Sequence, residues 1–169
     1  LGLAHKYVAG KTLGMIFAKS STRTRIAFEV GIYQLGGSGL FLNPQDIQLG
    51  RGETIKDTAR VLSRMLDGIM IRTYAHEEVL ELAKWADIPI INGLTDLLHP
   101  TQIIADLMTI QEYKGELAGL KCVFVGDGNN VCHSLMLAMV AAGVNVHIAC
   151  PKEFGPDPLI VPQAQALAS

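Results

Sequence analysis

Short apolar runs alternate along the chain with longer segments in which apolar residues recur at helical spacing. The short runs are rich in Val, Ile and Phe and are often bounded by Gly or Pro, a pattern typical of buried strands. They predict strands at residues 13–17, 39–42, 68–71, 88–91, 122–125 and 144–148.

The longer segments carry apolar residues at i, i+3, i+4 and i+7, the spacing of one helix face. The stripes are Ile26, Val30 and Tyr33; Ile55, Ala59, Leu62 and Leu66; Val79, Leu82, Ala83 and Ala86; Ile103, Leu107 and Ile110; and Leu135, Ala138, Met139 and Ala142. The alternation predicts an α/β fold, with a parallel sheet covered by helices on both faces. Such sheets bind ligands at the carboxyl ends of their strands.

A polar segment with two glycines, residues 113–119, follows the first four predicted strands. We place a domain boundary there, which gives a first domain of residues 1–113 and the beginning of a second, Rossmann-like α/β domain in residues 114–169. The helix expected over residues 100–113 would then bridge the two. Because residues 151–162 hold four prolines, we expect a loop there, and a helix that begins in residues 163–169.

With 169 residues, 49% of them hydrophobic, the chain can build a sizeable core. Its formal net charge of -2 argues against a general nucleic-acid-binding protein, so an anion site must be a local cluster of donors. The three cysteines show no C-x-x-C spacing, which favours a reduced, cytoplasmic compartment. We expect no signal peptide and no membrane span, since the most apolar stretch, residues 135–142, is too short to cross a bilayer.

The sequence Ser-Ser-Thr-Arg-Thr-Arg at residues 20–25 follows the first predicted strand and opens the first long helix. Free backbone N–H groups and the helix dipole attract an anion to such a turn, and hydroxyls and a guanidinium add donors. The alternative is that a Ser or Thr simply caps the helix. Three hydroxyls and Arg23 within four residues favour the anion site. Arg25, four residues before Glu29, is assigned a structural role.

Residues 19–29, KSSTRTRIAFE, closely resemble the S-T-R-T-R segment of the transcarbamoylases. Three further segments resemble, in the same order, the ornithine carbamoyltransferase branch of the aspartate/ornithine carbamoyltransferase superfamily: QLGRGETIKDTARVLSRMLDGIMIRT (48–73), INGLTDLLHPTQIIADLMTI (91–110) and VGDGNN (125–130). The resemblance runs from Gly10 to the end of the chain. It implies transfer of a carbamoyl group from carbamoyl phosphate to the side-chain amine of L-ornithine, giving L-citrulline and phosphate, in arginine biosynthesis or in the reverse direction in catabolism.

The resemblance also implies the residues of the site. The phosphate would be held by Ser21, Thr22, Arg23 and Thr24. The carbamoyl group would be held by the H-P-x-Q segment: His99, Pro100, Thr101 and Gln102. Arg72 would contact both the phosphate and the carbonyl oxygen, Asn130 would face ornithine, and Gln48 would reach the site of a neighbouring subunit in a homotrimer.

These roles suit the chemistry of carbamoyl transfer. Attack of an amine on the carbamoyl carbon places negative charge on the carbonyl oxygen, and Arg72, His99 and Thr24 would stabilise that charge as catalytic donors. The reaction requires no metal or cofactor, because holding two substrates together supplies much of the rate. Without the resemblance, Arg72 could be a surface residue that ends a strand, and His99 could be a structural residue before Pro100 at a helix start.

Two features depart from the family pattern. The ornithine branch usually carries Cys after His-Pro, whereas Thr101 resembles the putrescine and aspartate branches, so putrescine is the alternative acceptor. The D-x-x-x-S-M-G and H-C-L-P segments of the family's second domain do not occur in the 169 residues. We therefore expect a fragment that binds carbamoyl phosphate and shows little or no turnover by itself.

Two other classes of function are considered. Gly126 and Gly128 before a helix suggest a dinucleotide-binding oxidoreductase, but Val131 takes the place of the third glycine and no acidic residue ends the strand at residues 144–148. The other class is a non-catalytic module that binds carbamoyl phosphate or assembles with partners. Cys132 and His133 are adjacent and point to different faces of a helix, so we expect no shared metal.

Overall fold

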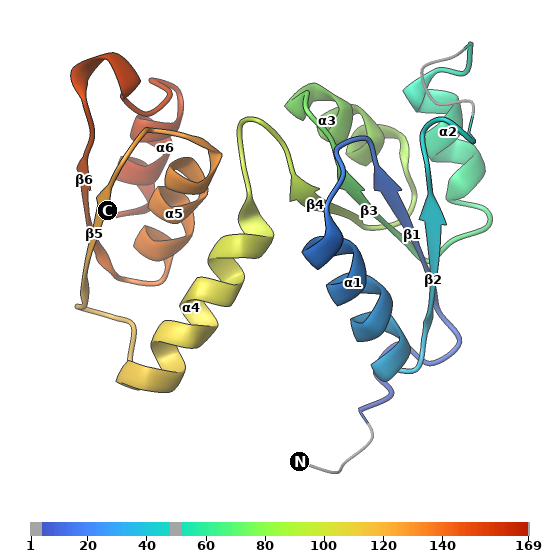
Figure 1. Cartoon of the computed structure of the whole chain (residues 1–169), viewed down its shortest axis with the longest axis horizontal. Coiled ribbons are helices and arrows are strands. Elements are labelled where there is room, and N and C mark those ends of the chain that lie inside the picture. The colour runs from blue at the N-terminus through green and yellow to red at the C-terminus, as the bar shows by residue number, and fades with distance from the viewer. Residues whose placement is uncertain (1–4, 48–51, 169) are drawn as a thin grey trace. The chain divides into compact units, whose positions relative to one another are not determined.

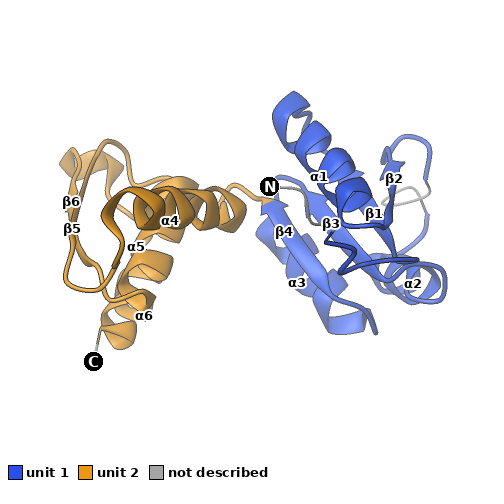
Figure 2. Cartoon of the chain, turned by 90° about the horizontal axis from the view of Figure 1, so that it is seen from below, with its two compact units in different colours: residues 1–93 blue, residues 94–169 orange. Residues whose placement is uncertain are grey.

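The computed structural model describes residues 5–47 and 52–168, which belong to two compact units, residues 1–93 and 94–169 (Figures 1 and 2). The elements are β1 (Thr12–Phe17), α1 (Thr22–Gln34), β2 (Ser38–Leu42), α2 (Ile55–Leu62), β3 (Gly68–Arg72), α3 (His76–Trp85), β4 (Ile90–Leu94), α4 (Pro100–Lys114), β5 (Lys121–Val125), α5 (Asn130–Ala141), β6 (Asn145–Ala149), the 3-10 helix η1 (Lys152–Phe154) and α6 (Ile160–Leu167). This alternation of strands and helices confirms the predicted α/β fold.

The sheet of unit 1 has the strand order β2-β1-β3-β4. β1 runs parallel to β2 and β3, and Met15 in the middle of β1 pairs with Phe41 and with Met70. Helix α1 covers one face of the sheet, and α2 and α3 cover the other (Figure 2). The expected cover on both faces is therefore confirmed, and it explains why β1 and β3 are apolar at nearly every position.

Alternate residues of the central strands enter two separate cores. On the α1 face the buried residues are Leu13, Met15, Phe17 and Met70, against which Phe28 and Ile32 pack. On the other face they are Ile16, Ala59, Leu66, Ile69, Ile71, Val79 and Leu82. Sheet and helices thus share apolar side chains on both sides, and the carboxyl ends of β1 and β3 are held firmly.

The stripe predicted for the first helix is wrong as a buried face. Ile26, Val30 and Tyr33 are 54%, 45% and 78% exposed, whereas Phe28 and Ile32 face the sheet. Helix α1 carries apolar residues on more than one side, so the spacing alone could not show which side the sheet covers.

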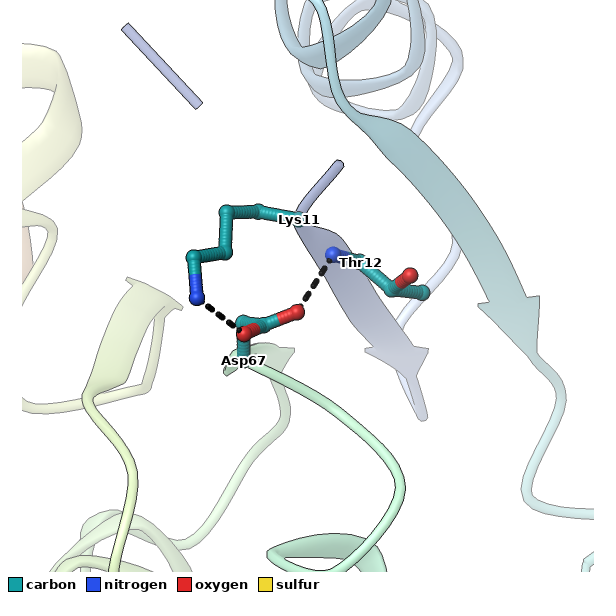
Figure 3. A network of polar contacts seen from close by, with 3 residues as sticks. All are labelled: Lys11, Thr12 and Asp67. Atoms are coloured by element: carbon teal, nitrogen blue, oxygen red, sulfur yellow. Dashed lines mark hydrogen bonds and ion pairs between the residues drawn. The ribbon is translucent and has the colours of Figure 1, made fainter. Parts of the chain in front are cut away.

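Asp67 joins the amino ends of β1 and β3 (Figure 3). Its carboxylate accepts a hydrogen bond from Nζ of Lys11 and another from the backbone N–H of Thr12, both at 2.8 Å. These bonds, with that from Lys11 first, lower the pKa of Asp67. The backbone N–H of Asp67 also donates to the carbonyl of Thr12 at 2.9 Å, so the strand register is fixed at the end of the sheet opposite to the carboxyl ends.

Unit 2 has a two-stranded parallel sheet, with α4, α5 and α6 on the same side of it (Figure 1). Cys122, Phe124, Val146 and Ile148 of the strands contribute to its cores. Alternate positions face the other way, and Val123 and Val125 are 64% and 77% exposed. Within the described residues, the sheet of unit 2 is therefore covered on one face only.

Helix α4 packs within unit 2, because Ile103 is fully buried in a core with Leu135, Met139 and Val144. Unit 2 accordingly begins at Leu94, and the polar segment at residues 113–119 lies inside it. α4 ends at Lys114 and is capped by Gly115, whose φ of 81° suits glycine. The domain boundary that the sequence predicts at residues 113–119 stays a prediction.

Two boundaries differ from the expected ones. β4 lies at Ile90–Leu94, two residues later than its apolar run, and α6 begins at Ile160 within the predicted loop. Pro162 falls in the first turn of α6, where the missing N–H of a proline costs no helical hydrogen bond. Across the described residues, no helix is both long and apolar enough to cross a membrane.

Trp85, the only tryptophan in the sequence, ends α3 beside three cationic side chains. Nζ of Lys56 lies 4.2 Å, the guanidinium carbon of Arg60 5.0 Å and Nζ of Lys84 5.3 Å from the centroid of its ring. Cations over an indole face are stabilised by its ring quadrupole, so α2 and α3 are joined at the surface of unit 1.

Candidate functional site

The turn between β1 and α1 lies at the carboxyl end of the sheet. The register sets Phe17, the last residue of β1, beside Arg72, the last residue of β3. The carbonyl of Arg72 accepts the N–H of Ala18 at 2.9 Å and that of Lys19 at 3.3 Å. The end of β3 therefore fixes the backbone that leads into α1.

Ser21 is the N-cap of α1, and its Oγ accepts the backbone N–H of Thr24 at 3.3 Å. The helix cap considered as an alternative is thus present, but it leaves the hydroxyl proton of Ser21 for another acceptor. The first turn of α1 contains no acidic residue. Its partial positive charge is therefore not offset by a carboxylate in that turn, which favours an anion there.

Arg72 and Thr24, far apart in the sequence, are brought together beside this turn. Nη1 of Arg72 donates to Oγ1 of Thr24 at 3.4 Å, a long hydrogen bond. Burial lowers the pKa of Arg72, and its Nε is buried without a hydrogen-bond partner among the described residues. A buried N–H of a cation is costly unless an acceptor meets it, so the guanidinium has a donor suited to an anion.

The other predicted phosphate-binding residues stand at the same turn. Thr22 and Arg23 begin α1 and are exposed, whereas Gln48 lies outside the described residues. Arg25 has the structural role assigned to it: its Nε pairs with Oε1 of Glu29 at 3.0 Å, and its guanidinium carbon lies 3.8 Å from the ring centroid of Phe41.

A cavity of about 890 Å³ lies next to the turn. Residues 20–22 line it, together with Asn43 and Gln45, which follow β2. Thr24 and Arg72 are not among the described residues that line it. Sequence reasoning did not select Asn43 and Gln45. Their position just after a strand of a parallel sheet was the signal that could have found them.

His99 lies in unit 2 as the N-cap of α4, with Pro100 as the first residue of the helix. Its backbone N–H donates to Oγ of Ser134 at 2.8 Å, and its Nδ1 lies 3.3 Å from Oγ1 of Thr101. Two residues of the H-P-x-Q segment thus contact each other, and the hydroxyl of Thr101 orients the ring of His99 from its Nδ1 side.

Gln102 and Asn130, expected at the substrates, both make contacts within unit 2. The amide nitrogen of exposed Gln102 donates to Oδ1 of Asp106 at 2.9 Å. Nδ2 of Asn130 donates to the carbonyl of Thr95 at 2.7 Å. Their roles toward the carbamoyl amide and toward ornithine stay predictions.

Sequence reasoning missed two buried polar residues of α5. Nδ1 of His133 lies 2.9 Å from the carbonyl of Leu97, and Ser134 binds the N–H of His99. The signal was present in the spacing: with Asn130 they stand at i, i+3 and i+4 on a helix that is otherwise mostly apolar.

The fold and these contacts define an α/β protein with a candidate anion site at a strand–turn–helix junction and an imidazole at a second helix start. Residues 2–112 match the family model of the aspartate/ornithine carbamoyltransferase carbamoyl-P binding domain, and residues 118–169 match that of the Asp/Orn binding domain. The chain belongs to the aspartate/ornithine carbamoyltransferase family, as its motifs predicted.

Similar proteins support this membership. The chain is 59% identical over 169 residues to an ornithine carbamoyltransferase of Thermococcus kodakarensis, covering 100% of this chain and 54% of the relative. It is 58% identical over 168 residues to one of Oceanobacillus iheyensis, covering 99% and 52%. Its structure resembles that of ornithine carbamoyltransferase from Pyrococcus furiosus with a TM-score of 0.93 and 55% identity, covering 97% and 52%. The chain thus spans about half the length of the relatives it matches.

Proposed function

We propose that the chain carries the carbamoyl-phosphate site of an enzyme that transfers the carbamoyl group to the side-chain amine of L-ornithine. The amine nitrogen forms a bond to the carbamoyl carbon, the bond from that carbon to the phosphate oxygen breaks, and the nitrogen loses a proton. The products are L-citrulline and phosphate, in arginine biosynthesis or in the reverse, catabolic direction. The main support is the buried, unpaired Nε of Arg72 beside Thr24 and the start of α1.

The phosphate would be bound at the start of α1. Ser21 and Thr22 would donate from their hydroxyls, Arg23 from its guanidinium and the helix from its first N–H groups. Thr24 would bind both the phosphate and, as a catalytic donor, the carbonyl oxygen. This part of the site stabilises the leaving phosphate as well as the bound substrate.

The carbonyl oxygen gains negative charge as the amine attacks, and Arg72 and His99 would donate to it. The contact of Thr101 with His99 suits this role. When the hydroxyl of Thr101 donates to Nδ1, the ring proton lies on Nε2, which is then the donor toward the oxygen. Pro100 sets the start of α4, and Gln102 would exchange its bond to Asp106 for the carbamoyl amide.

The binding of carbamoyl phosphate tests the core of the proposal. Calorimetry on the 169-residue chain should detect binding, and Arg72→Gln should weaken it roughly 10- to 100-fold, because hydrogen bonds to charged groups are lost. The control Arg64→Gln removes an exposed guanidinium of unit 1 that pairs with Asp87 and does not line the cavity, so it should leave the affinity almost unchanged. No binding by the wild type, or equal losses in both variants, would contradict the site.

The acceptor is the second question. Asn130 and the family relatives support ornithine, whereas Thr101 keeps putrescine as the alternative. Product formation from each amine should be measured with this chain and with a chimera continued by the second half of the T. kodakarensis relative. Equal or faster use of putrescine would contradict the ornithine assignment. Binding without turnover by the chain alone would support the non-catalytic module for these 169 residues.

We also propose a cytoplasmic homotrimer in which Gln48 reaches a neighbouring subunit. The support is the exposed stripe of Ile26, Val30 and Tyr33 on α1, an apolar surface that a second copy would cover. Sedimentation should show a trimer that Val30→Asp converts to monomers, and a monomeric wild type would contradict the assembly.

A further inference from the structure

The first two turns of α5 hold the loop that carries His99. Asn130 donates to the carbonyl of Thr95 at 2.7 Å, His133 contacts the carbonyl of Leu97 at 2.9 Å and Ser134 accepts the N–H of His99 at 2.8 Å. All three side chains bind backbone atoms of residues 95–99. We call them the loop clamp.

His133 is buried, at 5% exposure, and both of its ring nitrogens are engaged. Nδ1 faces the carbonyl of Leu97, so it carries a proton and donates. Nε2 accepts the backbone N–H of Asp157 at 2.8 Å, so it carries none. The contacts therefore define one neutral tautomer, which joins the loop before α4 to the segment between η1 and α6.

The loop itself is a tight turn. The N–H of Thr95 donates to the carbonyl of Leu98 at 2.8 Å, and Oγ1 of Thr95 accepts the N–H of Leu98 at 3.0 Å. The clamp adds bonds on both sides of this turn, ending at the N–H of His99. The backbone of His99 is thus positioned by α5, while Thr101 at the start of α4 contacts Nδ1 of its ring.

We propose that His133 and Ser134 are positioning residues for His99. They touch no reacting atom, and they hold the backbone of the loop so that the imidazole meets the carbonyl oxygen of carbamoyl phosphate. This inference rests on the proposed function of His99. Because a buried hydrogen bond fixes geometry that a mobile loop would have to regain for each substrate, loss of the clamp reduces polarisation of the carbonyl more than affinity for the phosphate.

The clamp can be tested in the 169-residue chain by amide hydrogen exchange and imidazole nitrogen NMR. Ser134→Ala should speed exchange of the His99 amide about tenfold, the effect of one lost hydrogen bond. Ser63→Ala is the matched control, because Ser63 likewise accepts a backbone N–H, that of Asp87 at 3.0 Å, but in unit 1. Unchanged exchange of the His99 amide in Ser134→Ala, or a His133 tautomer with its proton on Nε2, would overturn the clamp.

Two variants separate the two sides of His133. His133→Asn keeps a donor near the Nδ1 position, whereas His133→Gln offers an acceptor near the Nε2 position. Asparagine should preserve the loop and expose the Asp157 amide to exchange, and glutamine should do the reverse. If both variants loosen both segments equally, His133 only fills space, and the positioning role is contradicted.

The link to the substrate is tested with carbamoyl phosphate labelled with carbon-13 in the carbonyl. Bound to the wild type, the carbonyl signal should shift from its free position, and His99→Ala should remove the part due to the imidazole. Ser134→Ala and His133→Gln should lose the same part with little change in affinity, and His133→Asn should restore it. A full shift in Ser134→Ala would overturn the positioning role. If the wild type binds no carbamoyl phosphate, the proposed function fails, and with it the role toward substrate, while exchange and the tautomer still decide the clamp.

Discussion

The two units share the same α/β alternation but differ in whether the polar residues of the candidate site are hydrogen-bonded within the protein. In unit 1, the Nε of Arg72 is a buried donor that the described protein atoms do not satisfy, and the first turn of α1 holds no acidic residue. In unit 2, the loop before His99 is held by hydrogen bonds from α5 that satisfy both partners. Unpaired donors suit binding of an anion, whereas satisfied ones suit the holding of a catalytic group in place.

The units also differ in how their sheets are covered. Helices pack on both faces of the four-stranded sheet in unit 1, whereas the described part of unit 2 covers its two strands on one face. A small core loses a larger share of its stability with each buried contact. We therefore expect unit 2 to be the more fragile of the two.

The largest loss in free energy of unfolding should come from a substitution that leaves a cavity in either core. Ile103→Ala in unit 2 and Leu82→Ala in unit 1 each remove a fully buried side chain and should cost about 2–5 kcal/mol in free energy of unfolding. Hydrogen exchange should show that Ile103→Ala loosens the amides of β5 and β6, and that Leu82→Ala loosens those of β1 and β3. Equal loosening of both sheets by one substitution would show that the units do not unfold separately.

Adding a methyl group to a glycine should have opposite effects in the two units. A Cβ at Gly128 would overlap Gly155 and Pro156, so Gly128→Ala should cost roughly 1–3 kcal/mol. A Cβ at Gly31 in α1 meets nothing within 4 Å, so Gly31→Ala should raise stability by up to about 1 kcal/mol. Urea unfolding of both variants measures these changes, and a loss of stability in Gly31→Ala would contradict the open surface there.

Removal of a helix-capping side chain should change stability less, and by different amounts in the two units. Asn129 accepts the N–H groups of Val131 and Cys132, both at 3.1 Å, whereas Ser21 accepts one, at 3.3 Å. Asn129→Ala should therefore cost about 1 kcal/mol, and Ser21→Ala less. Thermal unfolding of the two variants compares them, and the reverse order would mean that the first turn of α1 depends on Ser21 more than its single long bond indicates.

The smallest expected effect is the loss at low pH of the stability that Asp67 contributes to unit 1. The pKa of Asp67 is lowered in the folded state, so its carboxylate stabilises the fold above the pKa of the unfolded state, and this contribution is lost as the pH falls through the folded pKa. Asp67 is exposed, so the loss should be slight. Comparison of wild type with Asp67→Asn below about pH 4 should show the two stabilities converging. Parallel curves would indicate that the bonds to Lys11 and Thr12 do not form in solution.

The sequence predicted the order of elements well, because buried parallel strands are short apolar runs bounded by glycine or proline. It also predicted the helix start at Ser21, because a Ser or Thr before a helix is likewise a local signal. It failed where the answer depends on packing at a distance. The stripe of Ile26 and Val30 has the right spacing for a core face, but only the position of the sheet shows that Phe28 packs against the core instead.

For the candidate site too, local motifs were predicted and contacts between distant residues were not. Family motifs selected Arg72 and Thr24, which the fold brings within 3.4 Å of each other. The spacing places His133 and Ser134 on one face of the helix with Asn130, but it does not show that they bind backbone atoms about 35 residues earlier in the chain, so the clamp was missed. Gln48 and the roles of Gln102 and Asn130 stay predictions.

Trp85 makes the comparison of the units measurable without labels. The only indole of the chain lies in unit 1, beside Lys56, Arg60 and Lys84, so its fluorescence reports on the unfolding of unit 1. Circular dichroism instead records helices from both. A melting curve followed by fluorescence and one followed by dichroism will coincide only if the chain unfolds as a single cooperative body. A dichroism signal that begins to fall while the emission is unchanged would identify unit 2 as the first to open.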